Sequence, residues 1–559
     1  MQRDLSALSS QIFDVIVIGA GIYGATITCS LAEAGFRVLV IDKGDFCSAT
    51  SANSLKILHG GLRYLQHADI KRMRETIVSR RELMRFSPHL VAPLACLIPT
   101  AGHGFRSWPV MAIASVFNNL ISADRNQQMH AAIKIPAGHI VTGDELLRAI
   151  PGYAQEGLSG GVVWHDGLAL NSERLVLEHI LAACDCGASA CNYLQADTIV
   201  TAGNRVAGIQ VTDQVGGEAC LLQTRWIVNA AGPWFDDLLN RSGIAAPPTR
   251  WAKAVNIVVS KPLHGPYAVG LEGQAGYEDK DALVKRGKRF FFFVPWRGGT
   301  MIGTTYHAYT GDKDSLAVTP HDLDEILAEV TGIYPAWRLA RQDITMVHGG
   351  LLPMSDTHAS DDGKVQLAKD SLLIDHGRQG GPKGLLSLRS IKYTTAPVEA
   401  KKITALIQKQ DHRQKLPAQA NLAQQPANDS GDRAIAPSLR EYLTGRYGRW
   451  ASRVWRYVDG GKPEHWWLCR EPDLLHAELV YFVREESAQT LADVVFRRTG
   501  LGTLQCPTAK VLDCMARAMA ALLGWNEERI DHEIQRVYAA YGPVVQQAVH
   551  PEQEGLRCR

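Results

Sequence analysis

The sequence lacks a long apolar run, a strong net charge and a recognisable secretion signal. No run approaches the roughly 18 consecutive apolar residues of a membrane-spanning helix, and the first residues, MQRDLSALSSQ, hold no apolar core of signal-peptide length. With 59 basic and 57 acidic residues the formal net charge is only +2, which gives nucleic-acid binding no support. We therefore expect a cytoplasmic protein without a membrane-spanning segment.

Clusters of metal ligands are also scarce. The 11 cysteines are odd in number and scattered, and a reducing compartment is their simplest explanation. Only Cys184, Cys186 and Cys191 lie close together, and no fourth ligand follows at a spacing suited to zinc. The sequence thus predicts no metal site.

Residues 13–42 predict a dinucleotide-binding βαβ unit. An apolar run leads into the glycine motif, an Ala/Leu-rich helical stretch follows, and a second apolar run ends at Asp42. Gly19 allows the tight turn, Gly21 lets the backbone approach a pyrophosphate, and Gly24 lets the helix pack on the strand. The helix N-terminus offers N–H groups to the phosphates. Asp42 is expected to bind the adenosine ribose, which disfavours NADP, but the unit alone does not distinguish FAD from NAD.

The segment that follows resembles a known family. Residues 50–66, TSANSLKILHGGLRYLQ, are closely similar to the signature of FAD-dependent glycerol-3-phosphate dehydrogenases, approximately SSxSxKLIHGGLRYLE. The resemblance continues in the same order along nearly the whole chain, at residues 73–93, 227–234, 291–312 and 476–502. The chain is identified as a divergent member of this family, which has the DAO-type flavoprotein fold.

The resemblance implies an α/β fold with three parts. A Rossmann-like FAD-binding domain of the glutathione-reductase type is interleaved with a β-sheet substrate domain within residues 1–410. Its FAD-binding pieces are expected at about 13–66, 160–235 and 345–410, and the substrate domain at about 67–155 and 240–345. Residues 411–437 are polar and rich in Pro, Ala and Gln, which is typical of a linker. Residues 438–559 are expected to form an all-α domain, with one helix starting at Pro507 and stopping at Gly524.

The cofactor implied by the resemblance is FAD. Its expected contacts lie in the glycine cradle, in the signature segment and in later family motifs, at Gly19, Gly21, Gly24, Asp42, Lys43, Ser51, Ser54, Lys56, His59, Gly60, Gly61, Ala231, Gly232, Trp234, Gly350 and Thr394. A helix is expected to begin around Pro397, capped by Thr394 or Thr395, with its positive end facing the pyrimidine side of the flavin.

The substrate-facing motifs depart from the family pattern. Leu352 stands in GGLLPM where the family's SGVRPL has an arginine, and Asn256 stands in KAVNIVV where KGSHIVV has a histidine. Tyr306 replaces the aspartate of IGTTD, and Ala396 and Pro397 replace the tyrosine and arginine of GGKxTTYR. Arginine guanidinium groups usually hold a phosphate through paired hydrogen bonds, and each charge-assisted bond contributes roughly 1.5 to 3 kcal/mol of stabilisation. Their loss predicts a changed substrate.

Several polar groups remain for the substrate and the chemistry. Alcohol oxidation by hydride transfer requires a base for the O–H proton and cations for the developing alkoxide. The expected substrate-binding residues are Arg63, Tyr64, Lys253, Asn256, Leu352 and Lys392, and Arg389 offers a further anion site. The expected catalytic residues are His348, Lys392, Arg63 and His307, with the base left open among His59, His307 and His348.

The predicted function is FAD-dependent oxidation of a CH–OH group in a polyol, sugar or hydroxy acid, phosphorylated or not, by hydride transfer to flavin N5. Quinone or another acceptor would take the electrons, and oxidase activity is not excluded. Two alternatives stay open: a true glycerol-3-phosphate dehydrogenase giving dihydroxyacetone phosphate, and a non-catalytic FAD-binding paralogue with a structural or regulatory role. The apolar residues 107–122 predict a helix that either packs in the core or lies on the inner face of the cell membrane. A homodimer is a further alternative.

Overall fold

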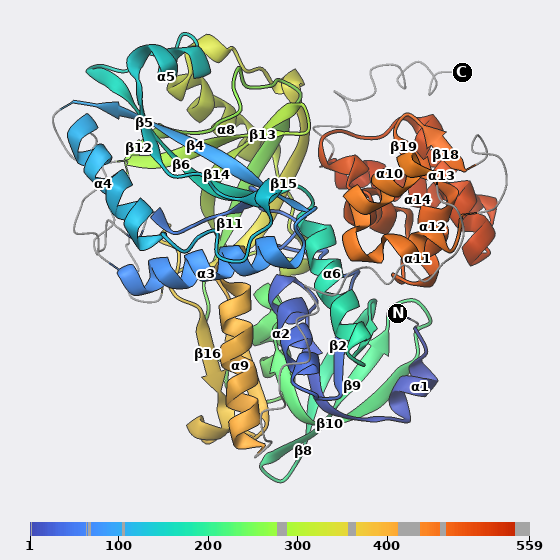
Figure 1. Ribbon diagram of the computed structural model, residues 1–559. Helices are drawn as coiled ribbons and strands as arrows, with labels where there is room; N and C mark the ends of the chain where they lie inside the picture. Colours follow the sequence, from blue (N-terminus) through green and yellow to red (C-terminus); the bar gives the residue numbers. More distant parts are fainter. Residues whose placement is uncertain are drawn as a thin grey trace.

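The chain forms two sheet-containing units and a largely helical C-terminal unit (Figure 1). The computed structural model describes residues 1, 3–62, 64, 69–102, 107–276, 288–355, 365–411, 436–458 and 466–542. The predicted substrate residue Arg63 and most of the predicted linker lie outside the described residues.

The first sheet contains the predicted βαβ unit. Its strand order is β16-β17-β10-β1-β2-β7, and the strands from β17 to β7 are parallel. The bounds are β16 Leu372–Asp375, β17 Leu385–Arg389, β10 Ala219–Asn229, β1 Ile12–Ile18, β2 Val38–Ile41 and β7 Ser189–Cys191, and the antiparallel hairpin β8 Leu194–Ala202 and β9 Arg205–Asp213 pairs with β10. Strands β1 and β2 are buried almost throughout, which explains their continuous apolar runs.

Helices cover this sheet on one face (Figure 1). Helix α2 (Ile22–Glu33) packs between α6 (Ser172–Asp185) and α9 (Ala396–Gln410). Because it has neighbours on both sides, most of its residues are buried, and it shows no polar face. Two short helices, α1 (Leu5–Ser9) and α7 (Phe235–Arg241), complete this unit.

The second sheet is mostly antiparallel, with the order β15-β11-β14-β13-β12-β4-β6-β3 and with β5 paired to β6. Its strands are β15 Ile344–Pro353, β11 Trp251–Val259, β14 Gly299–Tyr309, β13 Lys288–Trp296, β12 Ala268–Gly276, β4 Val91–Ala101, β6 Leu158–Ala169, β3 Ile57–Leu58 and β5 His139–Thr142. Four helices surround it, α3 Ile70–Phe86, α4 Trp108–Ile121, α5 Gly143–Ala149 and α8 Pro320–Ile333. Strands β3, β6 and β15 belong to this sheet, although the expected boundaries put all or most of each in FAD-binding pieces.

Helix α4 differs from the expectation of core packing. The side chains of Trp108, Val110, Ile113, Val116, Phe117 and Leu120 are all exposed, Leu120 to 68%. The helix lies at the outer edge of the second unit, away from the C-terminal unit (Figure 1). Among the described residues, no helix is both long and apolar enough to cross a membrane.

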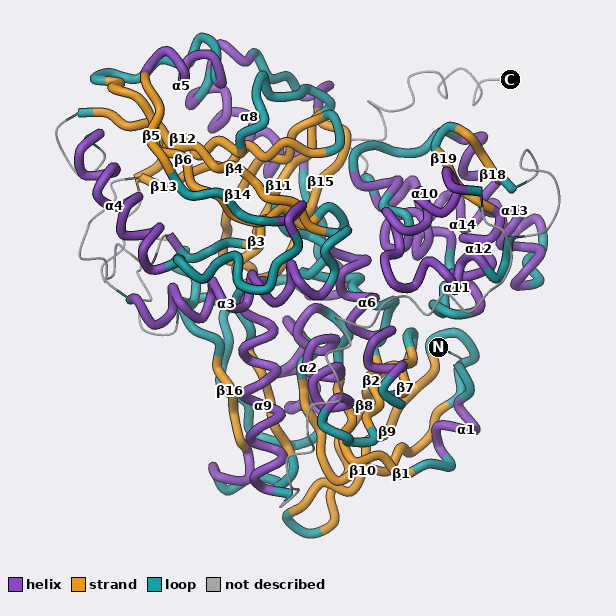
Figure 2. Tube along the Cα trace, viewed as in Figure 1, coloured by secondary structure: helices purple, strands orange, loops and turns teal. Residues whose placement is uncertain are grey.

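The C-terminal unit is mainly helical, as Figure 2 shows. Its helices are α10 Pro437–Tyr447, α11 Ala451–Trp455, α12 His476–Arg484, α13 Ala509–Leu523 and α14 Glu527–Ala540. The helical C-terminal domain also contains one short hairpin, formed by β18 (Trp467–Arg470) and β19 (Asp473–Leu475). Helix α13 starts after the N-cap Thr508, so Pro507 precedes the helix, and it ends at Gly524 with φ +70°.

Candidate active site

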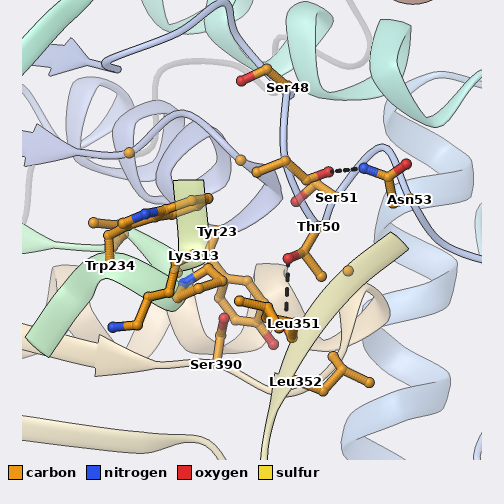
Figure 3. Close-up of a pocket in the computed structure, with 18 of the residues that line it drawn as sticks. Tyr23, Ser48, Thr50, Ser51, Asn53, Trp234, Lys313, Leu351, Leu352 and Ser390 are labelled. Atoms are coloured by element: carbon orange, nitrogen blue, oxygen red, sulfur yellow. Dashed lines mark hydrogen bonds between the residues drawn. The ribbon is translucent and has the colours of Figure 1, made fainter. Parts of the chain in front are cut away.

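A cavity of about 1130 Å³ opens where the two sheets meet. The residues that directly follow four parallel strands of the first sheet line it, namely Gly19 after β1, Asp42 after β2, Ala230 after β10 and Ser390 after β17. Ligands of open parallel sheets bind at these carboxyl ends. Strand β15 contributes Leu351 and Leu352, opposite the loop that carries Thr50 (Figure 3). The cavity exceeds the roughly 300–1,000 Å³ of small-ligand pockets, so it has room for a dinucleotide together with a substrate.

The glycine cradle has the close contacts that its motif predicts. A Cβ added at Gly19, where φ is +92°, would lie 2.6 Å from the carbonyl oxygen of Ala230. At Gly24 it would lie 1.7 Å from the carbonyl oxygen of Gly19, which leaves no room for a side chain between helix and strand. Gly21 is the N-cap of α2 and lines the cavity. The backbone therefore fits a bound pyrophosphate at this helix N-terminus.

Asp42 and Ser51 organise this end of the cavity. Asp42 accepts hydrogen bonds from the backbone N–H of Ala20 at 2.7 Å and of Gly44 at 3.0 Å. Its burial raises its pKa to about 6. Ser51 Oγ accepts from the N–H of Ile22 at 3.1 Å, in the first turn of α2. Both side chains line the cavity, and their bonds to backbone N–H groups hold the glycine cradle in place.

Lys56, a predicted FAD contact, lines the cavity. Its ammonium group is completely buried and donates to Glu173 at 2.5 Å, Ser172 at 2.8 Å and the carbonyl of Ala52 at 2.6 Å. An ammonium group has three N–H donors, so all of them are used. The ammonium group thus ties the signature segment to α6, and an FAD contact of Lys56 stays a prediction for the part of the side chain that faces the cavity.

The other predicted FAD residues divide into two groups. Lys43, Ser54, His59 and Gly350 line the cavity, as do Ala231, Gly232, Trp234 and Thr394. Gly60 and Gly61 do not line it. The N–H of Gly60 donates to Asp166 at 2.6 Å, and a Cβ there would collide with Arg80, so Gly60 acts in the packing behind the cavity.

Helix α9 begins at Ala396, with Pro397 in its first turn, as predicted. Thr395 is the N-cap but makes no capping bond; its hydroxyl instead bonds Tyr23 at 2.8 Å and the carbonyl of Lys392 at 3.2 Å. Lys392 lines the cavity, and its ammonium donates to the hydroxyl of Tyr64 and lies 4.1 Å from the centre of that ring. Tyr64 itself is buried and reaches the cavity through Lys392.

His59 is oriented by a buried carboxylate that the sequence did not reveal. Its Nδ1 lies 3.2 Å from Oδ2 of Asp166, and its side chain is 47% exposed. Asp166 also accepts from Arg80 at 2.7 Å and from the indole of Trp164 at 3.2 Å. Burial raises the pKa of Asp166, but the bond to His59 and the charge of Arg80 outweigh it and leave the pKa below its usual value. Asp166 therefore stays ionised, and Nε2 of His59 is the imidazole atom left for chemistry.

His348, another predicted base, is buried within β15. Its Nδ1 lies 3.0 Å from Oδ1 of Asn53, and burial lowers its pKa to about 3. Its side chain does not line the cavity. A neutral, enclosed imidazole of this kind favours a structural role.

Lys253 and His307 face away from the cavity, which corrects the prediction for both. Lys253 donates to Asp322 of α8 at 2.7 Å, and Nε2 of His307 lies 3.1 Å from Glu325 of the same helix. Side chains alternate between the faces of a strand. Asn256 on β11 therefore lines the cavity while Lys253 points to the opposite face of the sheet.

The wall contributed by the second sheet is uncharged. All described lining residues of β11, β14 and β15 are neutral: Trp251, Ala254, Asn256, Thr304, Tyr306, Gly350, Leu351 and Leu352. Asn256 is nearly buried, and its Oδ1 accepts from Thr304 Oγ1 at 2.6 Å. Leu352 thus presents an apolar surface at the position where the resemblance implies an arginine.

Sequence reasoning also missed Lys313, which lies in the cavity wall beside α7. Lys313 lines the cavity (Figure 3). Its ammonium group donates to Asp236 at 2.7 Å and to Asp237 at 2.9 Å. Lys43 pairs with Asp314 and lies 4.0 Å from the ring centre of Trp234. These contacts join distant segments, and the sequence TGDKDS carries no signal of them.

The cradle, the strand-end cavity and the second sheet define a dinucleotide-dependent oxidoreductase fold. Residues 14–383 match the model of the FAD dependent oxidoreductase family, DAO, and the chain belongs to that family. Residues 409–530 match the C-terminal domain of alpha-glycerophosphate oxidase. The protein is therefore an FAD-dependent oxidoreductase, and the predicted fold class, cofactor and enzyme class are confirmed.

Three of the similar proteins are named for glycerol 3-phosphate. A glycerol-3-phosphate dehydrogenase of Synechocystis is 26% identical over 96% of this chain and 97% of its own length. Glycerol-3-phosphate dehydrogenase 2 of Mycobacterium tuberculosis is 28% identical over 98% and 91%. The solved glycerol-3-phosphate dehydrogenase of Bacillus halodurans, complexed with FAD, has a TM-score of 0.70 at 22% identity, covering 97% of this chain and 96% of that one.

Proposed function

We propose that this FAD-dependent oxidoreductase oxidises a CH–OH group of a small polyol, sugar or hydroxy acid whose binding does not depend on an arginine-held phosphate. The main support for this proposal is the neutral wall formed by Leu352, Asn256 and Tyr306. A phosphate dianion facing this wall would lose water without gaining charged partners there, which is unfavourable. A hydroxyl-bearing carbon chain is accommodated by such a surface.

His59 is the proposed base. When bound, FAD supplies the hydride acceptor at its N5. Asp166 holds the ring through Nδ1, so Nε2 is available to take the hydroxyl proton of a substrate in the cavity. The buried carboxylate also stabilises the imidazolium that forms. Gly60 and Arg80 fix Asp166 from behind and so keep the ring in this orientation.

Lys392 is the proposed cation for the developing alkoxide. It comes from the connection between β17 and α9 and lines the cavity. Its contact with Tyr64 positions the ammonium group and leaves its charge in place. One ammonium group in this position suits an alkoxide or a carboxylate substrate better than it suits a phosphate dianion.

Glycerol 3-phosphate is the second candidate, because the similar proteins carry its name. Anaerobic reduction of the flavin distinguishes the two candidate substrate classes. The purified yellow protein is mixed anaerobically with polyols, hydroxy acids and glycerol phosphates, and the loss of the visible flavin band is followed. We expect unphosphorylated compounds to bleach the flavin at lower concentration than glycerol 3-phosphate. Bleaching by glycerol 3-phosphate at the lowest concentration would overturn the proposed substrate class. If no compound bleaches the flavin, the proposal that this site oxidises such CH–OH groups is overturned.

We further propose that α4 rests on the surface of a membrane, from which a quinone or another acceptor takes the electrons. The helix has no charged residue and exposes six large apolar side chains. A helix of this kind is stabilised when its apolar face enters the headgroup region. The double variant Phe117→Glu/Leu120→Glu should sediment with phospholipid vesicles much less than the parent. If both stay in solution and the parent alone forms dimers, α4 is instead a contact between two copies.

A further inference from the structure

The loop after β2 carries several residues that line the cavity and one buried acid, Asp45, that does not. Within residues 42–49, Asp42, Lys43, Gly44 and Ser48 line the cavity. Asp45 does not line it and is 1% exposed. The side chain of Asp45 therefore contacts another part of the molecule, and the position of the loop depends on that contact.

The partners of Asp45 come mainly from the C-terminal unit. Arg497 donates its Nε to Asp45 at 2.5 Å, and Arg498 donates through both terminal nitrogens, one of them at 2.9 Å. Asn192 adds a bond at 2.9 Å from the first unit. The carboxylate thus receives two guanidinium groups in a site from which water is excluded.

The two arginines are themselves fixed. They end a π-helical turn, Asp493–Arg498, a local geometry often associated with function. Arg497 also bonds Asp493 at 2.5 Å, and Asp493 accepts from Tyr193 at 2.6 Å. Arg498 also donates to the carbonyl of Glu486 at 2.7 Å. Two carboxylates and two guanidinium groups balance in charge, as a buried cluster requires.

The two arginines keep Asp45 in its charged form. Burial by itself would raise the pKa of Asp45, but Arg498 and Arg497 outweigh burial and hold the pKa below its usual value. Among the described residues, none after Thr394 lines the cavity. The described part of the C-terminal unit therefore acts on the cavity through elements such as this loop.

We propose that the C-terminal unit is a cofactor-retention element: Arg497 and Arg498, acting through Asp45, hold the loop 42–49 where Asp42, Lys43 and Ser48 line the cavity, so that FAD affinity depends on this contact. The three residues are positioning residues because none of them touches the cavity. This proposal rests on FAD as the cofactor and is independent of which substrate is oxidised.

The test is titration of FAD into apoprotein prepared from the full chain. Arg498→Lys keeps the charge and removes the two-pronged bond, and we expect it to raise the dissociation constant of FAD by about tenfold or more. The matched control is Arg453→Lys, which alters another Arg–carboxylate pair between the same C-terminal unit and α6, the one with Asp185. The control should bind FAD as the parent does and show the same visible circular dichroism of the bound flavin.

A second variant separates positioning from simple charge attraction. Asp45→Asn removes the anchor of the loop and leaves both arginines. If the arginines only attracted the anionic cofactor, this variant would bind FAD more tightly than the parent; positioning predicts weaker binding. Circular dichroism in the far ultraviolet verifies that each variant is folded, and Arg497→Lys replaces Arg498→Lys if the latter is not. Parent-like FAD affinity in the folded Arg498→Lys and Asp45→Asn variants would overturn the proposal.

Discussion

At the scale of single residues, buried carboxylates decide which of the expected site residues act. Asp166 orients His59 toward the cavity, whereas Glu173 binds the ammonium group of Lys56 and ties the signature segment to α6. Asp322 likewise holds Lys253 on the far face of the second sheet. A motif names the residue type, and the partner that the fold brings to it determines where the side chain points.

The proposed base leads to a sharp prediction. His59→Gln should lower the rate of flavin reduction by about 10²- to 10⁴-fold, because it removes the proton acceptor. Flavin content should be unchanged, since Asp166 keeps its bonds to Gly60 and Arg80. Stopped-flow reduction with a substrate found in the anaerobic panel measures the effect. A variant His348→Gln that is slowed as much as His59→Gln would show that the base has been assigned wrongly.

Buried His348 predicts a pH dependence of stability. Its folded-state pKa of about 3 lies below the unfolded value, so the unfolded chain binds more protons between about pH 3 and 6.5. Stability from this group is complete above about pH 6.5 and is lost as the pH falls, at up to roughly 1.4 kcal/mol per pH unit. Urea unfolding of His348→Gln from pH 7 to pH 5 should give a shallower loss than the parent. Substitution of exposed His321 by Gln should leave the parent slope unchanged.

At the scale of elements, the cradle could be predicted because its determinants are local. Strand, glycine motif, helix and acid follow one another within residues 13–42, so the sequence contains the whole unit. The face on which Lys253 or Asn256 lies depends instead on the register of β11 against β14 and β15, where a bulge follows Val255. The exposure of α4 depends on the absence of a covering neighbour among the described residues, which its apolar sequence does not reveal.

The cradle can be tested by one added methyl group. Gly24→Ala should abolish FAD retention and lower the melting temperature, because the new Cβ would lie 1.7 Å from the carbonyl oxygen of Gly19. Gly143→Ala is the matched control, since a Cβ there meets nothing within 4 Å. Flavin content after gel filtration measures the difference. A yellow, stable Gly24→Ala protein would contradict the close packing of α2 on β1.

At the scale of the whole molecule, the cavity is maintained by contacts between units that are separate in sequence. Lys313, from the connection between β14 and α8, reaches Asp236 and Asp237 at α7 of the first unit. Trp296 and Thr345 of the second sheet bind carbonyl groups of the C-terminal unit at Thr503 and Leu504. Each unit therefore restrains the others around the cofactor.

Removing the Lys313 bridge should loosen the cofactor. Lys313→Met is expected to increase the rate of FAD release by roughly threefold to tenfold, and added salt should narrow the difference from the parent because it screens the pair in the parent. Lys401→Met, which alters the more exposed pair with Glu82, serves as the control. Release is followed by flavin fluorescence at low and high ionic strength. Equal rates for parent and Lys313→Met would show that the bridge does not restrain the cavity.

The four strand ends beneath the cavity also have a consequence for biosynthesis. Strand β1 ends at Ile18, but its neighbour β10 ends at Asn229, and β17 ends at Arg389. Ribosomes add about 5 to 20 residues per second, so many seconds separate the synthesis of the first and last of these strands. Parallel pairing of distant strands is slow, because the chain loses loop-closure entropy before the strand contacts that stabilise it can form. The nascent chain must therefore protect an apolar, half-built sheet until β17 arrives, and FAD can enter its complete site only late in translation or afterwards.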